Sequence, residues 1–78
     1  MPLKALVVTV AKALVDYPED VDVREVDGAH NSVIELRVAP GDVGKVIGRD
    51  GRTAQSIRIL LSAAASKVGR RMHLDILD

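Results

Sequence analysis

Residues 44–51 read GKVIGRDG, and a run of helix-forming residues follows them as far as about Lys67. Two glycines three positions apart, directly before a helix, predict a tight turn whose backbone N–H groups face outward. Such a turn suits an anion, and in particular a phosphodiester. We therefore interpret this corner as the candidate functional site of the chain.

Basic residues gather around this corner, although the chain as a whole is neutral, with 11 basic and 11 acidic side chains. Residues 41–71 carry seven basic and two acidic side chains, whereas residues 1–40 carry four basic and seven acidic ones. Because the local field attracts a polyanion more than the total charge does, this block favours a nucleic-acid partner. The alternative is that these charges only solvate helix faces.

The first segment has the spacing of an amphipathic helix. Between Leu3 and Val15, apolar residues recur at intervals of three and four, which predicts a helix at about 3–16. Pro18 prevents its continuation.

Two strands are predicted next. Residues 20–27 alternate at first and then slip at Val26, which indicates a strand with a bulge. Residues 27–31 have the composition of a hairpin connection, with His30 as a solvated turn residue. A second strand follows at 32–38, with apolar residues alternating along one face.

Two helices and a last strand follow. Asp42 is the expected N-cap of a short helix at 43–47. The longest helix is expected at about 51–68, before Gly69, and a strand begins at Met72. The inward-facing residues of that long helix are expected to be Ala54, Ile57, Leu61, Ala64 and Val68.

The order α-β-β-α-α-β predicts an α+β fold in a single domain spanning residues 1–78. The compact solution is a three-stranded mixed sheet covered on one face by helices, because the hairpin is antiparallel and the right-handed crossover joins parallel strands. The chain has no cysteine, so it has no disulfide. No apolar run approaches ~18 residues, and we expect a cytoplasmic protein without a membrane span.

Residues 46–51, VIGRDG, followed by Ile57 in the next helix, resemble the signature of a KH domain. The element order resembles the type II arrangement, and the likeness covers the whole chain. The resemblance implies a non-enzymatic, cofactor-free RNA-binding protein of post-transcriptional regulation, such as an RNA chaperone. Its GxxG loop would grip the backbone of about four single-stranded nucleotides while the bases lie in an apolar groove.

The residues expected to bind RNA lie in and beside this loop. Gly48 and Gly51 lack a Cβ and allow close approach of a backbone. Arg49 can fork to phosphate oxygens, and Lys45 and Arg52 add charge on either side. The predicted set is Lys45, Ile47, Gly48, Arg49, Asp50, Gly51, Arg52 and Thr53. The alternative is a plain helix–turn–helix corner.

The other members of the set have more local roles. Ile47, together with Val43, would form an apolar floor for bases, and Thr53 could offer a hydroxyl. Asp50 either repels phosphate or caps the following helix by accepting an N–H near Thr53. Tyr17 is the single aromatic residue and is distant in sequence, so we expect weak, sequence-tolerant and mostly electrostatic binding without base stacking.

Other chemistry does not match the pattern. Residues 41–45 resemble a P-loop only loosely, because Ala39 stands where its first glycine is required and Val46 follows the lysine. His73 is expected to be an exposed strand residue with no ligand cluster around it. The sequence shows no recognisable nucleophile–base pair, so we expect neither an enzyme nor a metal site.

The long helix carries more apolar residues than its inward stripe uses, namely Ile59, Leu60, Ala63 and Ala65. Either the helix is buried more deeply than its predicted inward stripe implies, or this face is a surface for self-association or for a partner. The family resemblance implies a homodimer and/or a heterodimer with a larger KH-containing protein of the Jag/EloR type. The competing functions are a protein–protein scaffold with incidental nucleic-acid binding and, more weakly, a binder of single-stranded DNA.

Overall fold

The structure is a computed structural model that describes residues 3–29 and 31–77, so the predicted turn role of His30 lies outside the described residues. The predicted α+β fold and its element order are confirmed. The main elements are α1 (Leu3–Leu14), β1 (Asp22–Asp27), β2 (Ser32–Arg37), α2 (Val43–Ile47), α3 (Arg52–Lys67) and β3 (Met72–Leu77). Short 3₁₀ helices join them: η1 (Pro18–Asp20), η2 (Pro40–Asp42) and η3 (Arg49–Gly51).

The sheet has the order β1-β2-β3, with β1 antiparallel and β3 parallel to the central β2. The predicted mixed sheet is therefore confirmed. The predicted bulge in the first strand is wrong, because the β1–β2 ladder runs without interruption from the Asp22–Arg37 pair to the Asp27–Ser32 pair. The apolar alternation stops at Val23 because Glu25 occupies the next inward position and Val26 faces outward, 51% exposed.

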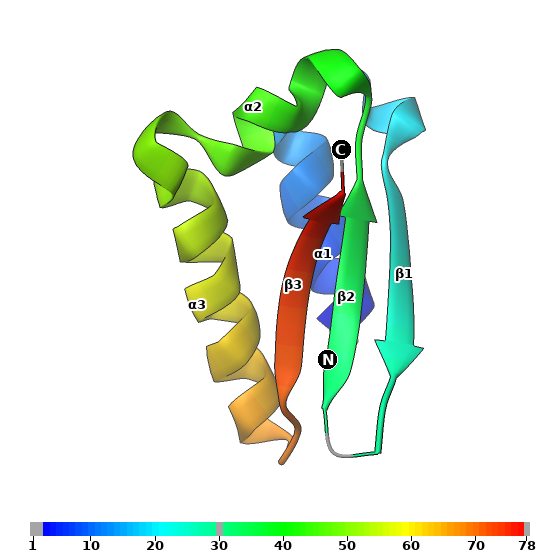
Figure 1. Cartoon of the computed structure of the whole chain (residues 1–78), viewed down its shortest axis with the longest axis vertical. Helices are drawn as coiled ribbons and strands as arrows, with labels where there is room; N and C mark the ends of the chain where they lie inside the picture. Colours follow the sequence, from blue (N-terminus) through cyan, green and yellow to red (C-terminus); the bar gives the residue numbers. More distant parts are fainter. Residues whose placement is uncertain (1–2, 30, 78) are drawn as a thin grey trace.

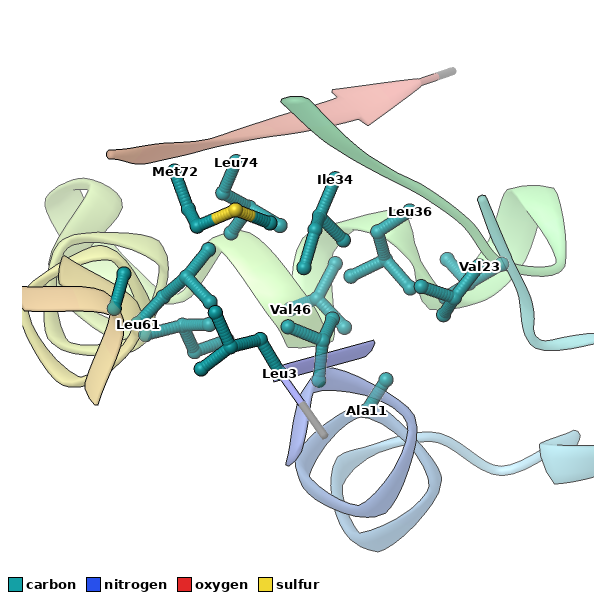
Figure 2. Packing of buried hydrophobic residues seen from close by; sticks show 13 residues of the cluster. Leu3, Ala11, Val23, Ile34, Leu36, Val46, Leu61, Met72 and Leu74 are labelled. Carbon is teal, nitrogen blue, oxygen red and sulfur yellow. The ribbon is translucent and has the colours of Figure 1, made fainter. Parts of the chain in front are cut away.

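Helices α1 and α3 pack on one face of the sheet, and α3 runs alongside β3 (Figure 1). Figure 2 shows the side chains of Ile34 and Leu36 pointing from the sheet toward Leu61 of α3 and Leu3 of α1. Val46, from the short α2, is also fully buried in this cluster. Removing such a side chain from water contributes about 1.5–3 kcal/mol, so this layer accounts for much of the stability.

The buried stripe of α3 differs from the predicted one at its C-terminal end. Ala54, Ile57 and Leu61 are buried as predicted, but the next buried residue is Ala65, while Val68 is 53% exposed. The helix ends at Lys67, so Val68 lies past its last turn and no longer follows the helical spacing. The exposed fractions of Ile59 and Leu60, 59% and 54%, rule out a deeply buried helix.

Asp42 does not cap α2 as predicted. Its backbone is close to helical (φ −102°, ψ −7°), because η2 leads directly into α2, and its side chain makes no capping hydrogen bond. The carboxylate is instead buried and accepts the backbone N–H groups of Asp16, at 3.2 Å, and Tyr17, at 3.0 Å. Lys45 lies 3.3 Å from the Asp16 carboxylate, so the start of α2 is fastened to the segment that follows α1.

Candidate nucleic-acid interface

The loop between α2 and α3 turns the chain with three positive φ angles within four residues. Gly48 has φ 78°, Asp50 has φ 57° and Gly51 has φ 73°. Glycine adopts such angles freely, and aspartate tolerates them better than most side chains do. The loop lies at the outer corner of the molecule, where α2 meets α3 (Figure 1).

Two of the four loop amides are already occupied. The Gly48 N–H donates to the Gly44 carbonyl at 2.9 Å, and the Gly51 N–H donates to the Gly48 carbonyl at 3.2 Å. The amides of Arg49 and Asp50 have no acceptor among the residues that the structure describes. Of the backbone N–H groups that were predicted to face outward, only these two adjacent ones are therefore free, and they need a partner or water.

The two glycines have different surroundings. A Cβ on Gly48 would lie 2.6 Å from the Cβ of Thr53 and 2.9 Å from its backbone nitrogen, whereas nothing lies within 4 Å of a Cβ on Gly51. Gly48 is thus required by the packing of the turn itself, and Thr53 is the half-buried residue that packs against it. At Gly51, in contrast, there is open space for an approaching nucleic-acid backbone.

The charged residues of the predicted site are all exposed. Arg49 and Arg52 have no carboxylate within 4.0 Å among the described residues, whereas Lys45 pairs with Asp16. The interpretation of Asp50 as a helix cap is wrong, because no side-chain cap hydrogen bond is present at the start of α3. Its carboxylate faces solvent beside the open amides.

The apolar part of the predicted site is smaller than expected. Ile47 is 37% exposed at the end of α2 and offers an apolar surface beside the loop. Val43 is half-buried and packs against the core, so only part of its side chain is open to a base. Tyr17 is 53% exposed, but its amide donates to the Asp42 carboxylate at the opposite end of α2. Tyr17 therefore adds no aromatic surface to the loop of residues 48–51.

A hollow of about 430 Å³ between α3 and β3 was not predicted from the sequence. Sequence reasoning counted its arginines only as part of the basic block, because the pairing of α3 with β3 depends on the tertiary fold. The spacing of Arg58, Ser62 and Ser66 at intervals of four does place them on one helix face. The lining residues are Arg58, Ser62, Ser66, Arg70, Arg71, Met72, His73 and Leu74.

Arg70 connects the end of α3 to the sheet. Its guanidinium lies 3.0 Å from the Glu25 carboxylate and 3.4 Å from that of Asp27, and it donates to the Ser32 hydroxyl at 3.3 Å. The Ser32 hydroxyl in turn donates to Asp27 at 3.0 Å. This network offsets the charge of Arg70, so Arg70 is mainly a structural residue of the basic block.

Two other kinds of feature are absent from the part of the chain that the structure describes. Within residues 3–29 and 31–77, no group of three or more His, Asp or Glu side chains could hold a metal ion. In the same part of the chain, no helix is both long and apolar enough to cross a membrane.

Comparison with known proteins gives consistent matches over nearly the whole chain. The family model described as KhpA/KhpB, KH domain, matches residues 4–76. The chain is 54% identical over 76 residues to a protein of Halalkalibacterium halodurans named RNA-binding protein KhpA, covering 97% of this chain and 100% of the relative.

Two further relatives carry the same name. The protein of Caldanaerobacter subterraneus subsp. tengcongensis is 54% identical over 72 residues, covering 92% of this chain and 96% of the relative. The protein of Borreliella burgdorferi is 47% identical over 73 residues, covering 94% and 89%. No solved structure matches the chain significantly.

Proposed function

The chain belongs to the KhpA/KhpB KH-domain family, and we propose that it is a non-enzymatic protein that binds single-stranded RNA through the loop of residues 48–51. The observation that carries the proposal is the pair of unpaired amides at Arg49 and Asp50 in an exposed, positively charged corner. The family relatives named RNA-binding protein KhpA support the choice of ligand.

Binding at this loop would follow from its donors. The two open amides would donate to phosphate oxygens, as in other anion-binding turns. The guanidiniums of Arg49 and Arg52 would add charge-assisted hydrogen bonds to the same backbone. Contacts to phosphate position a strand without reading its bases, so the expected affinity is sequence-tolerant and falls with salt.

The double variant Arg49→Gln/Arg52→Gln tests this proposal. Each lost phosphate contact should lower the salt dependence of single-strand binding by about 0.7 in log–log slope, giving about 1.4 for the pair. The measurement is fluorescence anisotropy with a ten-nucleotide uridine oligomer at several salt concentrations. The matched control Lys12→Gln/Arg37→Gln removes two exposed charges outside the loop and should leave the slope unchanged. An equal loss in both variants would reject the loop as the site.

A second candidate function rests on the outer face of α3. Ile59 and Leu60 are 59% and 54% exposed, with Ala63 exposed one turn further on. An apolar strip of this kind favours a protein contact. Its occupant would be a second copy of the chain or a larger KH-containing partner of the Jag/EloR type, which is the scaffold alternative.

Sedimentation of the Leu60→Glu variant tests whether the apolar strip on α3 binds a second copy of the chain. A charge at this exposed position should convert a dimer to a monomer while leaving the fold intact. The matched control is Val26→Glu, which places the same charge on a side chain of similar exposure, 51%, on the open sheet face. If wild type sediments as a monomer, self-association is rejected. A tight dimer that recovers no RNA on crosslinking in cells would favour the scaffold function.

A further inference from the structure

We propose that the free edge of β1 binds an extended, basic segment of a partner protein, which joins the three-stranded sheet as a further strand. This interaction is separate from the RNA binding proposed for the loop of residues 48–51. In Figure 1, β1 lies at the edge of the sheet opposite to α3, so a segment bound there would leave the loop open.

The hydrogen bonds at the hairpin indicate which way the backbone of β1 faces. The Gly28 N–H donates to the Asn31 carbonyl at 2.8 Å, so these two residues form a hydrogen-bonded pair. Facing residues in an antiparallel ladder alternate between hydrogen-bonded and non-hydrogen-bonded pairs, so the next pair, Asp27 and Ser32, is of the second kind. Consistently, the Ser32 N–H donates at 3.0 Å to the Arg71 carbonyl, on the side away from β1. The backbone groups of Asp27 therefore point toward the open edge.

The same alternation applies along the rest of the strand. Because the β1–β2 ladder is uninterrupted, the N–H and C=O groups of Val23, Glu25 and Asp27 all face the edge. Among the described residues, no group forms a hydrogen bond with these backbone atoms. A row of unpaired groups of this kind is a template for strand addition, in which main-chain hydrogen bonds supply the affinity.

The charge of this edge selects the partner. Residues 16–27 carry six acidic side chains and one basic side chain. Lys45 and Arg70 pair with some of the acids, but Glu19 and Asp20, in the turn before β1, have no cation within 4.0 Å in the described part of the chain. The edge thus stays negative, which attracts a lysine-rich or arginine-rich segment and opposes RNA or a second copy of the same edge.

The test is an amide NMR titration of the full chain, at low salt, with an eight-residue peptide of alternating lysine and valine. The resonances of Val23, Glu25 and Asp27 should shift and their hydrogen exchange should slow, because their N–H groups gain acceptors. The amides of Asp22 and Val26 face β2 in the same alternation and should change much less. A response at every second residue is the signature of a strand added at this edge.

Matched peptides and variants test the backbone contacts and the charge separately. The same peptide with all its backbone amides methylated should bind at least about tenfold more weakly, because it cannot donate to the edge carbonyls. The same peptide with glutamate in place of lysine should also bind at least about tenfold more weakly. Asp20→Asn should weaken binding of the lysine peptide about twofold to fourfold. The control Asp75→Asn removes an exposed charge two strands away from β1 and should leave binding unchanged.

Several outcomes would overturn the proposal. One is the absence of binding by the lysine peptide, and another is equal binding of the methylated or the glutamate peptide. Slower exchange of Val23, Glu25 and Asp27 as the concentration of the protein alone increases would identify a second copy as the occupant. Shifts of the same three amides on addition of a ten-nucleotide uridine oligomer would assign the edge to RNA instead.

Discussion

The two ends of α2 each carry an aspartate, and their surroundings are opposite. Asp42, at the start of the helix, is 1% exposed, and both of its carboxylate oxygens accept backbone amides. Asp50, three residues past the end, is exposed and accepts no hydrogen bond from the described residues. The first aspartate satisfies donors of its own chain, and the second sits in a loop whose donors are left open.

This contrast explains how a small domain can present an open loop at a defined position. A helix of five residues is far too short to be stable alone. The carboxylate of Asp42 and the burial of Val46 hold α2 against the rest of the molecule. The loop of residues 48–51 therefore projects from a fixed support, and its unpaired amides are held in place before any ligand arrives.

The largest effect is expected from removing the buried carboxylate. Asp42→Ala would leave the part-buried amides of Asp16 and Tyr17 without their acceptor, at up to about 1–3 kcal/mol each. Urea denaturation should show a loss of about 2–5 kcal/mol in the free energy of unfolding. The matched substitution Asp50→Ala should change it by less than about 0.5 kcal/mol, and equal losses would contradict the contrast.

Alanine substitutions at the two loop glycines should distinguish the packed side of the turn from its open side. Gly48→Ala combines a strained positive φ with a clash against Thr53, so we expect a loss of about 2–4 kcal/mol. Gly51→Ala meets only the φ strain, about 1–2 kcal/mol. Thermal unfolding of the two variants measures the difference. A greater loss of stability for Gly51→Ala would contradict the packing of Thr53 against Gly48.

Reversing the charge of Asp50 sharpens the contrast on the functional side. Asp50→Lys should tighten single-stranded RNA binding by roughly threefold to tenfold at low salt, because a repulsive charge beside the open amides becomes attractive. The gain should shrink as salt increases. Glu19→Lys makes the same charge change at an exposed position of η1 and is the control. Weaker binding by the Asp50 variant would indicate that the carboxylate supports the loop.

The smallest effect is expected at Lys45. Its exposed ion pair with Asp16 is worth at most about 1 kcal/mol, so Lys45→Gln should change the free energy of unfolding little. The same pairing competes with phosphate, and RNA affinity should fall less than it does in Arg49→Gln. RNA titrations of the two variants at the same salt concentration measure this order. A larger loss of RNA affinity for Lys45→Gln than for Arg49→Gln would contradict it.

Local spacing was sufficient to predict the fold. The interval of apolar residues in α1 and α3, the hairpin connection and the handedness of the crossover together specify the mixed sheet. The glycine pair with its helical flanks also located the loop. These signals depend on residues that are near one another in sequence.

The features that were missed depend on contacts between distant residues. Asp42 resembled an ordinary N-cap, because the amides that it accepts lie 26 and 25 positions earlier. The hollow beside α3 forms only when β3 packs against that helix. Likewise, spacing could not show which loop amides are used within the turn, since this follows from the backbone angles at Gly48 and Gly51.

The most direct test of the central claim is the chemical shift and hydrogen exchange of the four loop amides during titration with single-stranded RNA. The amides of Arg49 and Asp50 should shift downfield and become protected as RNA binds, because they gain a phosphate acceptor. Those of Gly48 and Gly51, which already donate within the turn, should change much less. Saturated binding with the Arg49 and Asp50 amides unshifted and unprotected would contradict the account.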